Sequence, residues 1–444
     1  MDSDTDIQTL QNEVKQLYDA QEFVQALPKL DALLKRDPNN LTALLYKADI
    51  LCEFGHRQQS LAIAQHALDI APKNPIILSL MSKILDNLAD FEGSVHYAKR
   101  AYKIAPQLPI VLKAYVSALP NTQNSAPLIA KIVPRLLATK DAESDNIAAI
   151  ALESVGKIPE SIRTFRAGIR RFLVLIANTA KSPPPPQPKR KESMDKTKQT
   201  LLAIKGMLDS LGVPFCLAHG SLLGIYRDGD LLPGDSDIDV MLPWSVDRVW
   251  LAGELARLGC VCVIPAHELR DIRGQWCFSV RLPPHWNAIV EMSFLKPENG
   301  KVWFGFARGQ NVIRIPISPF GFAKVRYLGV DFPIPNPCDV HLCKIYGANW
   351  RTRIRNRNFF IIHPELDDPS HIRISYALNH ILDGLLTGNY KKAQGYTEQL
   401  LSVYDDPLLY ELRTYFANLP FEITLFPPLP WQSERIHYRE VIGS

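Results

Sequence analysis

The sequence predicts two structural classes along one chain: an all-α helical repeat, followed by an α+β domain with a mixed sheet. In the first third of the chain, related residues return every 34 positions. A proline-rich stretch at residues 181–193 then ends this pattern. Beyond it, short apolar runs of strand length alternate with amphipathic stretches of helical period. We therefore expect a helical repeat at 1–180, a linker at 181–193 and the α+β domain at 194–444.

The repeat is defined by prolines and small residues at a constant spacing. Pro38, Pro72 and Pro106 are 34 residues apart, and small residues such as Ala26 recur at the same interval. Small residues let paired helices approach closely, and proline ends each helix pair. The period resembles the tetratricopeptide repeat. Such stacks present a concave surface, so we expect either a protein partner there or a spacer that fixes geometry.

The second half begins with an amphipathic helix and then contains several strand candidates. Leu201, Ile204 and Leu208 form one stripe of a helix predicted at 195–212, which Gly212 ends. A further helix pair is expected before the linker, at 145–171, and helices return from about residue 371. Strands are expected at 213–218, 238–242, 260–264, 276–282 and 288–295.

Composition restricts the class of protein. The chain has 444 residues, of which 46% are hydrophobic and 22% charged, as in ordinary globular proteins. A net charge of +4 is too small to indicate a nucleic-acid partner. The seven cysteines favour buried thiols in a reducing compartment, although Cys260, Cys262 and Cys277 leave a zinc site open. We expect neither a signal peptide nor a transmembrane segment, and a cytoplasmic protein.

Aspartates are crowded where a strand enters the core. On a strand, Asp237 and Asp239 point to the same face, and Asp235 joins them if the extension begins that early. Like charges this close repel by about 1 kcal/mol in water and more near an interior, so a hard divalent cation is expected. Glu291, in the apolar run "NAIVEMSFL", can supply the third carboxylate. The expected order is a strand, a Gly-Ser turn, a helix and then Asp-x-Asp on the next strand. This order resembles that of the nucleotidyltransferase superfamily.

A longer motif narrows the family. The run "GSLLGIYRDGDLLPGDSDIDV" at 220–240 resembles the signature of the LicD-type phosphocholine transferases, fukutin and fukutin-related protein. A second block at 332–351, "FPIPNPCDVHLCKIYGANWR", resembles a downstream motif of that family. Two positions depart from the pattern: Gly234 stands where tryptophan is usual, and Glu291 where aspartate is usual.

The resemblance implies transfer of an alcohol phosphate, such as phosphocholine, ribitol phosphate or glycerol phosphate, from a CDP-activated donor to a glycan hydroxyl. Asp237, Asp239 and Glu291 are then the catalytic, metal-binding residues for Mg²⁺ or Mn²⁺, with Glu291 either a metal ligand or the general base. The amides of Gly220 and Ser221 are expected to bind phosphate at a helix N-terminus.

Several arginines and aromatic residues are further substrate-binding candidates. Arg227 is expected either to clamp the diphosphate or to pair with Asp235. Arg351 and Arg353, followed by Arg355 and Arg357, would share one face if extended, as an anion-binding patch or a solvated surface. We expect His219 to be structural. Four tryptophans could stack on sugar or cytosine, but most are expected in the core: Trp276, Trp286, Trp303 and Trp350.

Two other functions stay open. The same carboxylates would serve a nucleotidyltransferase that moves NMP from NTP to a small molecule or protein. A non-catalytic scaffold built on the repeats is the second alternative. Because the chain shows no membrane anchor of the kind a Golgi enzyme needs, we favour bacterial surface-polysaccharide synthesis, in the cytoplasm or at the inner face of the membrane, with the repeats binding a protein partner.

Overall fold

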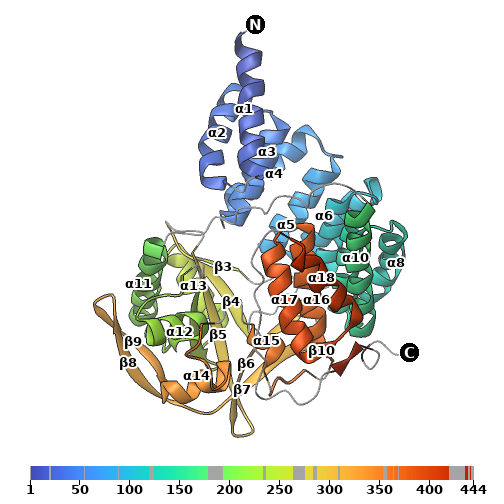
Figure 1. The fold of residues 1–444 in the computed structure, drawn as a ribbon. Helices are drawn as coiled ribbons and strands as arrows, with labels where there is room; N and C mark the ends of the chain where they lie inside the picture. The colour runs from blue at the N-terminus through green and yellow to red at the C-terminus, as the bar shows by residue number, and fades with distance from the viewer. Residues whose placement is uncertain are drawn as a thin grey trace. The chain divides into compact units, whose positions relative to one another are not determined.

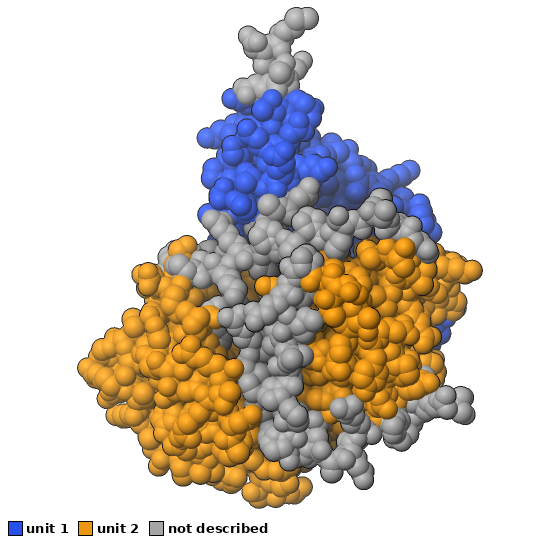
Figure 2. Space-filling view, in the orientation of Figure 1, with its two compact units in different colours: residues 1–132, 187–190 blue, residues 133–186, 191–444 orange. Residues whose placement is uncertain are grey.

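The protein folds into helices and strands over most of its length (Figure 1). The computed structural model describes residues 2–19, 22–54, 56–88, 90–119, 125–178, 194–233, 237–263, 276–283, 288–308, 311–353, 358–363, 365–368, 370–419, 436–438 and 441. The predicted linker at 181–193 and Asp235 lie outside these residues. The chain divides into two compact units, coloured separately in Figure 2: residues 1–132 with 187–190, and residues 133–186 with 191–444.

Unit 1 is a series of antiparallel helices. They are α1 (Asp2–Asp19), α2 (Phe23–Arg36), α3 (Leu41–Glu53), α4 (Arg57–Ile70), α5 (Pro75–Asn87), α6 (Phe91–Ile104) and α7 (Pro109–Ala118), and α8 (Ser125–Ala138) contains the division between the units. The spacing of 34 residues reappears in the helix caps. Asn40 accepts a hydrogen bond from the Ala43 amide, and Asn74 caps α5 in the same way.

The small residues of the repeat lie where helices touch. Ala26, Ser60 and Ser94 are at most 1% exposed, and the Ser60 hydroxyl donates to the carbonyl of Ala48 on the preceding helix. A larger side chain at these positions would push the paired helices apart. The helical repeat predicted from the sequence is therefore confirmed.

Unit 2 contains both the sheet and a second group of helices. The helices are α9 (Ala142–Ser154), α10 (Ile158–Asn178), α11 (Met194–Ser210), α12 (His219–Asp228), α13 (Arg248–Arg257), α14 (Cys338–Tyr346), α15 (Phe359–Ile362), α16 (Ile372–Leu386), α17 (Tyr390–Val403) and α18 (Pro407–Ala417). The strands are β1 (Cys216–Leu217), β2 (Asp237–Pro243), β3 (Val261–Val263), β4 (Cys277–Arg281), β5 (Ile289–Glu298), β6 (Lys301–Arg308), β7 (Asn311–Ile317), β8 (Gly321–Tyr327), β9 (Val330–Asn336), β10 (Tyr404–Asp405) and β11 (Ile436–His437).

The central sheet is mixed, as predicted. Its strand order is β1-β2-β5-β4-β3, and β6 continues from β5 and pairs with β7. Strands β2 and β5 run parallel, whereas the other neighbours in this sheet are antiparallel. The register places Asp239 beside Glu291 and Asp237 beside Ile289. Strands β8 and β9 form a separate two-stranded hairpin.

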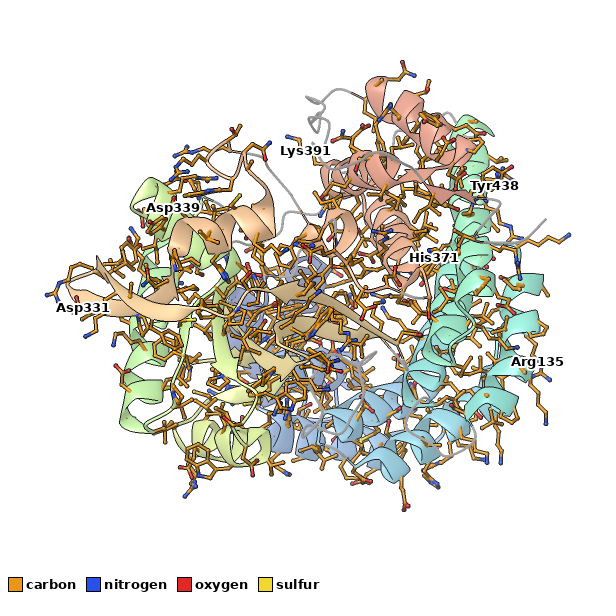
Figure 3. All side chains as sticks on the ribbon, turned by 90° about the horizontal axis from the view of Figure 1, so that it is seen from below. Arg135, Asp331, Asp339, His371, Lys391 and Tyr438 are labelled. Atoms are coloured by element: carbon orange, nitrogen blue, oxygen red, sulfur yellow. The ribbon has the colours of Figure 1, made fainter. Side chains whose placement is uncertain are left out.

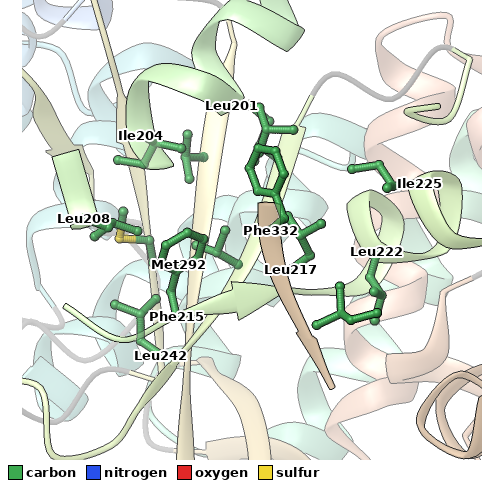
Figure 4. Close-up of a cluster of buried hydrophobic side chains, with 14 of the residues drawn as sticks. Leu201, Ile204, Leu208, Phe215, Leu217, Leu222, Ile225, Leu242, Met292 and Phe332 are labelled. Carbon is green, nitrogen blue, oxygen red and sulfur yellow. The ribbon is translucent and has the colours of Figure 1, made fainter. Parts of the chain in front are cut away.

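One face of the sheet carries the core of the α+β part (Figure 4). Leu201, Ile204 and Leu208 of α11 pack there with Leu222 of α12 and Met292 of β5. The predicted stop at Gly212 is present, since this residue has a φ of +65° directly after α11. Side chains alternate along β2, so those that do not face this core point to the opposite face of the sheet.

The glycine in the middle of α12 has a packing reason. A Cβ on Gly224 would lie 2.7 Å from the carbonyl oxygen of Asp230 and 2.8 Å from the amide nitrogen of Leu232. The chain that leads from α12 to β2 therefore packs directly on the helix backbone at this point. Only glycine permits that approach.

The boundary of the second unit differs from the predicted boundary at residue 180. Helices α9 and α10 share a hydrophobic core with α16, in which Ile162 and Phe165 pack with Leu378 and Leu382. Arg308 of β6 also forms a buried bidentate ion pair with Glu153 of α9, at 2.6 and 2.7 Å. The period of these helices resembles that of the repeat, but their apolar faces are covered by the C-terminal helices.

Candidate active site

Three carboxylates converge at the parallel pair of strands. Asp237 and Asp239 of β2 and Glu291 of β5 each offer an oxygen, and these oxygens lie within 4.8 Å of one another. We call this group the carboxylate triad. It forms because Asp237 and Asp239 alternate out of the core, while the register sets Asp239 beside Glu291. Hard oxygen donors grouped this closely suit Mg²⁺ or Mn²⁺.

The electrostatics of Glu291 agree with a cation site. Part of the Glu291 side chain is exposed to solvent, but protein atoms closely surround its carboxyl group. This partial desolvation, followed by repulsion from Asp237, raises the pKa of Glu291 to about 7. Among the described residues, neither Asp237 nor Glu291 forms an ion pair. Cys260, Cys262 and Cys277 do not group as metal ligands in this part of the chain.

The Gly-Ser turn holds the triad directly. The amides of Gly220 and Ser221 donate to Asp239 Oδ2 at 2.9 and 3.4 Å, and the Asp239 amide donates to the Ser221 hydroxyl at 3.0 Å. In this structure both amides therefore bind Asp239, and their role in binding phosphate stays a prediction. They are occupied because α12 begins beside β2, which brings its N-terminus onto the carboxylate. The turn therefore orients Asp239.

Arg227 has partners among the described residues that were not predicted, while its pairing with Asp235, which lies outside those residues, and its contact with a diphosphate stay predictions. Its guanidinium forms a bidentate pair with the neighbouring Asp228, at 3.0 and 2.9 Å, and donates to the carbonyl of Trp350 at 3.2 Å. The hydrogen bonds from Arg227 lower the pKa of Asp228. The indole of Trp350 also lies 6.1 Å from the ring of Tyr226, centroid to centroid. Arg227 thus joins the two motifs of the family signature and has a structural role.

Two members of the predicted arginine run, Arg351 and Arg353, lie within the described residues, and both predicted alternatives, an anion-binding patch and a solvated surface, stay open. Arg351 and Arg353 follow a turn and are not part of a strand. Arg351 pairs with Asp339 of α14, and Arg353 lies 3.4 Å from Asp228. Arg355 and Arg357 lie outside the described residues. Figure 3 shows Asp339 beside the sheet part of unit 2, and His371 among the helices.

A basic residue that sequence reasoning missed lies on the triad face. Ser279 of β4 is beside Glu291, and Arg281 of β4 is beside Ile289, which in turn is beside Asp237. Two strand spacings therefore separate the backbones of Arg281 and Asp237, about 10 Å. Only the pairing of β4 with β5 places Arg281 on this face, and the sequence alone does not reveal that pairing.

The remaining candidates are mostly structural. His219 is buried between Phe304 and Phe359, and burial, followed by the proximity of His341, lowers the pKa of His219 to about 3. Trp276 and Trp350 are buried, as expected. Trp303 lies under the Arg314 guanidinium at 4.3 Å. Trp286 lies outside the described residues.

The fold and the triad together define a nucleotidyltransferase-type domain attached to a helical repeat. Residues 212–336 match the family model of the LicD/FKTN/FKRP nucleotidyltransferase domain, and residues 17–84 match that of a tetratricopeptide repeat. These matches confirm the resemblance that the two sequence patterns indicated. The first match indicates a transferase with a phosphotransferase-like role in glycan modification. The second indicates protein interaction.

Solved structures add little to these matches. MamA is 12% identical with a TM-score of 0.29, over 40% of this chain and 96% of that one. YrrB, described as a tetratricopeptide protein with an unusual peptide-binding site, is 15% identical with a TM-score of 0.27, over 38% and 89%. A repeat protein from Parabacteroides merdae is 19% identical with a TM-score of 0.28, over 38% and 66%.

Two negative findings complete the comparison. The search of curated proteins gave no match. In the part of the chain that the structure describes, every helix is too short or too polar to cross a membrane.

Proposed function

We propose that this protein transfers an alcohol phosphate from a CDP-activated donor to a glycan hydroxyl, with release of CMP. The donor class is the phosphocholine, ribitol phosphate or glycerol phosphate type, and bacterial surface polysaccharide is the proposed context. The observation that carries the proposal is the convergence of the carboxylate triad within a match to the LicD/FKTN/FKRP domain.

Asp237 and Asp239 are the proposed ligands of a divalent cation, and the amides of the Gly-Ser turn fix the carboxylate of Asp239. When bound, Mg²⁺ or Mn²⁺ supplies positive charge that neutralises the diphosphate and the leaving CMP. The guanidinium of Arg281, on the same face of the sheet, is the proposed contact for a donor phosphate oxygen.

Glu291 is the proposed general base. In the transfer, the acceptor oxygen forms a bond to the donor phosphorus, the bond from that phosphorus to the CMP oxygen breaks, and the hydroxyl proton passes to a Glu291 carboxylate oxygen. The Glu291 carboxylate offers an oxygen within 4.8 Å of the oxygens of the two proposed cation ligands, so a proton acceptor lies beside the place where the cation would bind.

The decisive experiment follows CMP release with purified full-length protein and MgCl₂. CDP-ribitol, CDP-glycerol and CDP-choline are each supplied, with water as the acceptor in the absence of a glycan, and CTP and ATP are supplied in parallel with pyrophosphate as the readout. CMP from at least one CDP-alcohol, without pyrophosphate from either NTP, supports the proposal. Pyrophosphate release alone would replace it with NMP transfer, and no product from any donor would favour a scaffold.

A second measurement separates a base from a metal ligand at Glu291. We expect Glu291→Gln to lower CMP release at least about 100-fold while Mg²⁺ affinity, measured by calorimetry, changes less than about threefold. Asp237→Asn serves as the matched control and is expected to lose both. Loss of Mg²⁺ binding in Glu291→Gln would assign Glu291 to the metal shell.

The repeats are the proposed site of a protein partner. Their match to the tetratricopeptide family and their stacked helices support this assignment. Such a partner would bring the glycan acceptor to the enzyme.

A further inference from the structure

A cluster of neutral polar and aromatic side chains lies in the helical part of unit 2. Tyr376 and His380 of α16 and Tyr396 of α17 contact one another, with ring centroids 4.5, 4.7 and 6.2 Å apart. Asn358, the N-cap of α15, donates from Nδ2 to both tyrosine oxygens at 3.2 Å. We call these four residues the tyrosine cluster. All four are partly exposed, so a ligand can reach them.

The cluster lies on the side of the sheet that bears the triad. Cys277 of β4, on the same face as Glu291, packs against the helical core. Phe306 of β6 contacts Tyr376, with centroids 5.1 Å apart. Burial raises the pKa of Tyr376, and the charge of Glu291 makes a smaller contribution to this rise.

A row of aromatic rings also connects the cluster with the Gly-Ser turn. His219, adjacent to Gly220, contacts Phe359 of α15 at 4.9 Å between centroids. Phe359 contacts Phe360 at 4.7 Å, and Phe360 contacts Phe306 at 4.6 Å. Helix α15 itself contacts β7 as well as α16 and α17 (Figure 1). The position of the cluster relative to the triad is therefore fixed by packing.

The chemistry of the cluster favours an uncharged ligand. The guanidinium of Arg308 lies 5.2 Å from the centre of the Tyr376 ring, but Glu153 already compensates its charge through two hydrogen bonds. Burial raises the pKa of both tyrosines, so both phenols are neutral at physiological pH. Hydroxyl and amide groups beside aromatic rings suit a sugar, whose C–H face stacks and whose hydroxyls form hydrogen bonds.

We propose that Asn358, Tyr376, His380 and Tyr396 form the subsite for the neutral sugar ring of the acceptor. This assignment rests on the proposed function, in which the acceptor hydroxyl must face Glu291. The donor diphosphate is expected on the other side of the triad, near Asp237 and Arg281. Residues 358–396 lie beyond the 212–336 segment that matches the family model, so acceptor choice resides in a part of the chain outside that match.

The test measures sugar binding without turnover. Saturation-transfer NMR is recorded on the full-length protein with methyl glycosides of glucose, galactose and N-acetylgalactosamine, and separately with cytidine. We expect transfer to ring C–H protons of at least one glycoside. Tyr376→Ala and Tyr396→Ala should weaken its binding about tenfold and leave cytidine unchanged. Tyr410→Ala on α18 is the control and should leave both unchanged.

Each other outcome overturns the proposal. Unchanged glycoside binding in both alanine variants would remove the cluster from the acceptor site, and loss of cytidine binding would assign it to the nucleobase. Tyr376→Phe and Tyr396→Phe keep the packing and remove only the hydroxyls, so a fold defect is distinguishable. The NMR test consumes no donor, so glycoside binding can be measured even if the phosphotransfer assay fails. Conversely, a loss of glycoside binding leaves CMP release to water unaffected.

Discussion

Two groups of carboxylates in this molecule are in opposite electrostatic situations. In unit 1, Asp49 and Glu53 of α3 both accept from Lys83 Nζ of α5, each at 2.7 Å, and the hydroxyl of Tyr18 donates to Asp49. Burial lowers the pKa of Lys83, but Asp49 and Glu53 outweigh it and hold this pKa above its ordinary value. This group is compensated within the protein.

The carboxylate triad is held differently. Asp239 accepts from backbone amides, and burial, followed by repulsion from Asp237, raises the pKa of Glu291. Both groups contain clustered acids, so clustering by itself does not distinguish a structural network from a cation site. The distinction is the counter-charge: Lys83 pairs with both acids in unit 1, whereas among the described residues neither Asp237 nor Glu291 forms an ion pair.

The largest expected effect tests this distinction directly. Asp237→Asn should lower CMP release from the preferred CDP-alcohol at least about 100-fold, because one of the proposed cation ligands becomes neutral. Asp49→Asn, a similar change in the compensated group, should leave CMP release within about twofold. Equal losses in the two variants, measured as kcat/KM, would contradict the comparison.

The next effect concerns the cation supplied by the protein itself. Arg281→Ala should raise the KM for the CDP-alcohol about tenfold with a smaller change in kcat, because a charged hydrogen bond to the donor is removed. Arg326→Ala, on the exposed β8–β9 hairpin, is the control and should match the wild-type protein. An unchanged KM in Arg281→Ala would contradict the proposed contact between Arg281 and the donor phosphate.

A smaller effect is expected on stability and its pH dependence. The folded-state pKa of Glu291 is raised to about 7, so the ionised carboxylate destabilises the metal-free fold above its ordinary pKa. With EDTA, Glu291→Gln should therefore raise Tm by about 2 °C at pH of about 8, and this gain should disappear near pH of about 4. Glu411→Gln on α18 should show no such pH dependence. A gain that grows as pH falls would reverse the assigned sign.

The smallest effect is expected in unit 1. Lys83→Met removes the ammonium group that pairs with Asp49 and Glu53, and partial exposure of the three residues limits the loss to about 0.5 kcal/mol in the free energy of unfolding at neutral pH. Denaturant titrations of the variant and the wild-type protein measure this loss. An unchanged free energy of unfolding would contradict the prediction.

Much of the fold follows from local pattern. The period of 34 residues, the apolar stripe of α11 and the alternation on β2 each reflect neighbours along one element. The strands predicted at 238–242, 276–282 and 288–295 correspond to β2, β4 and β5. The hairpins β6–β7 and β8–β9 were not predicted, because their partners come from pairing across turns without a strong turn signal.

The candidate site likewise contains residues that local sequence pattern predicts and residues that only long-range packing places. Asp237, Asp239 and Glu291 were identified because acids inside apolar strands are costly unless a ligand compensates them. The observed partners of Arg227, Asp228 and the Trp350 carbonyl, were not predicted, since the packing of α12 against a distant segment brings the Trp350 carbonyl to it. The face shared by Arg281 and Glu291 depends on strand order, which no spacing in the sequence encodes.

The buried pair between Arg308 and Glu153 constrains how the two functions of this chain can be separated. A version shortened at the proline-rich stretch would lose α9 and α10, leave the guanidinium of Arg308 buried without its counter-ion and expose the apolar face of α16 to water. The proposed transfer would then fail through damage beside the proposed sugar subsite, and an observer would wrongly attribute that failure to the missing partner. A shortened version that separates the repeats from unit 2 therefore has to keep all residues from 133 onward.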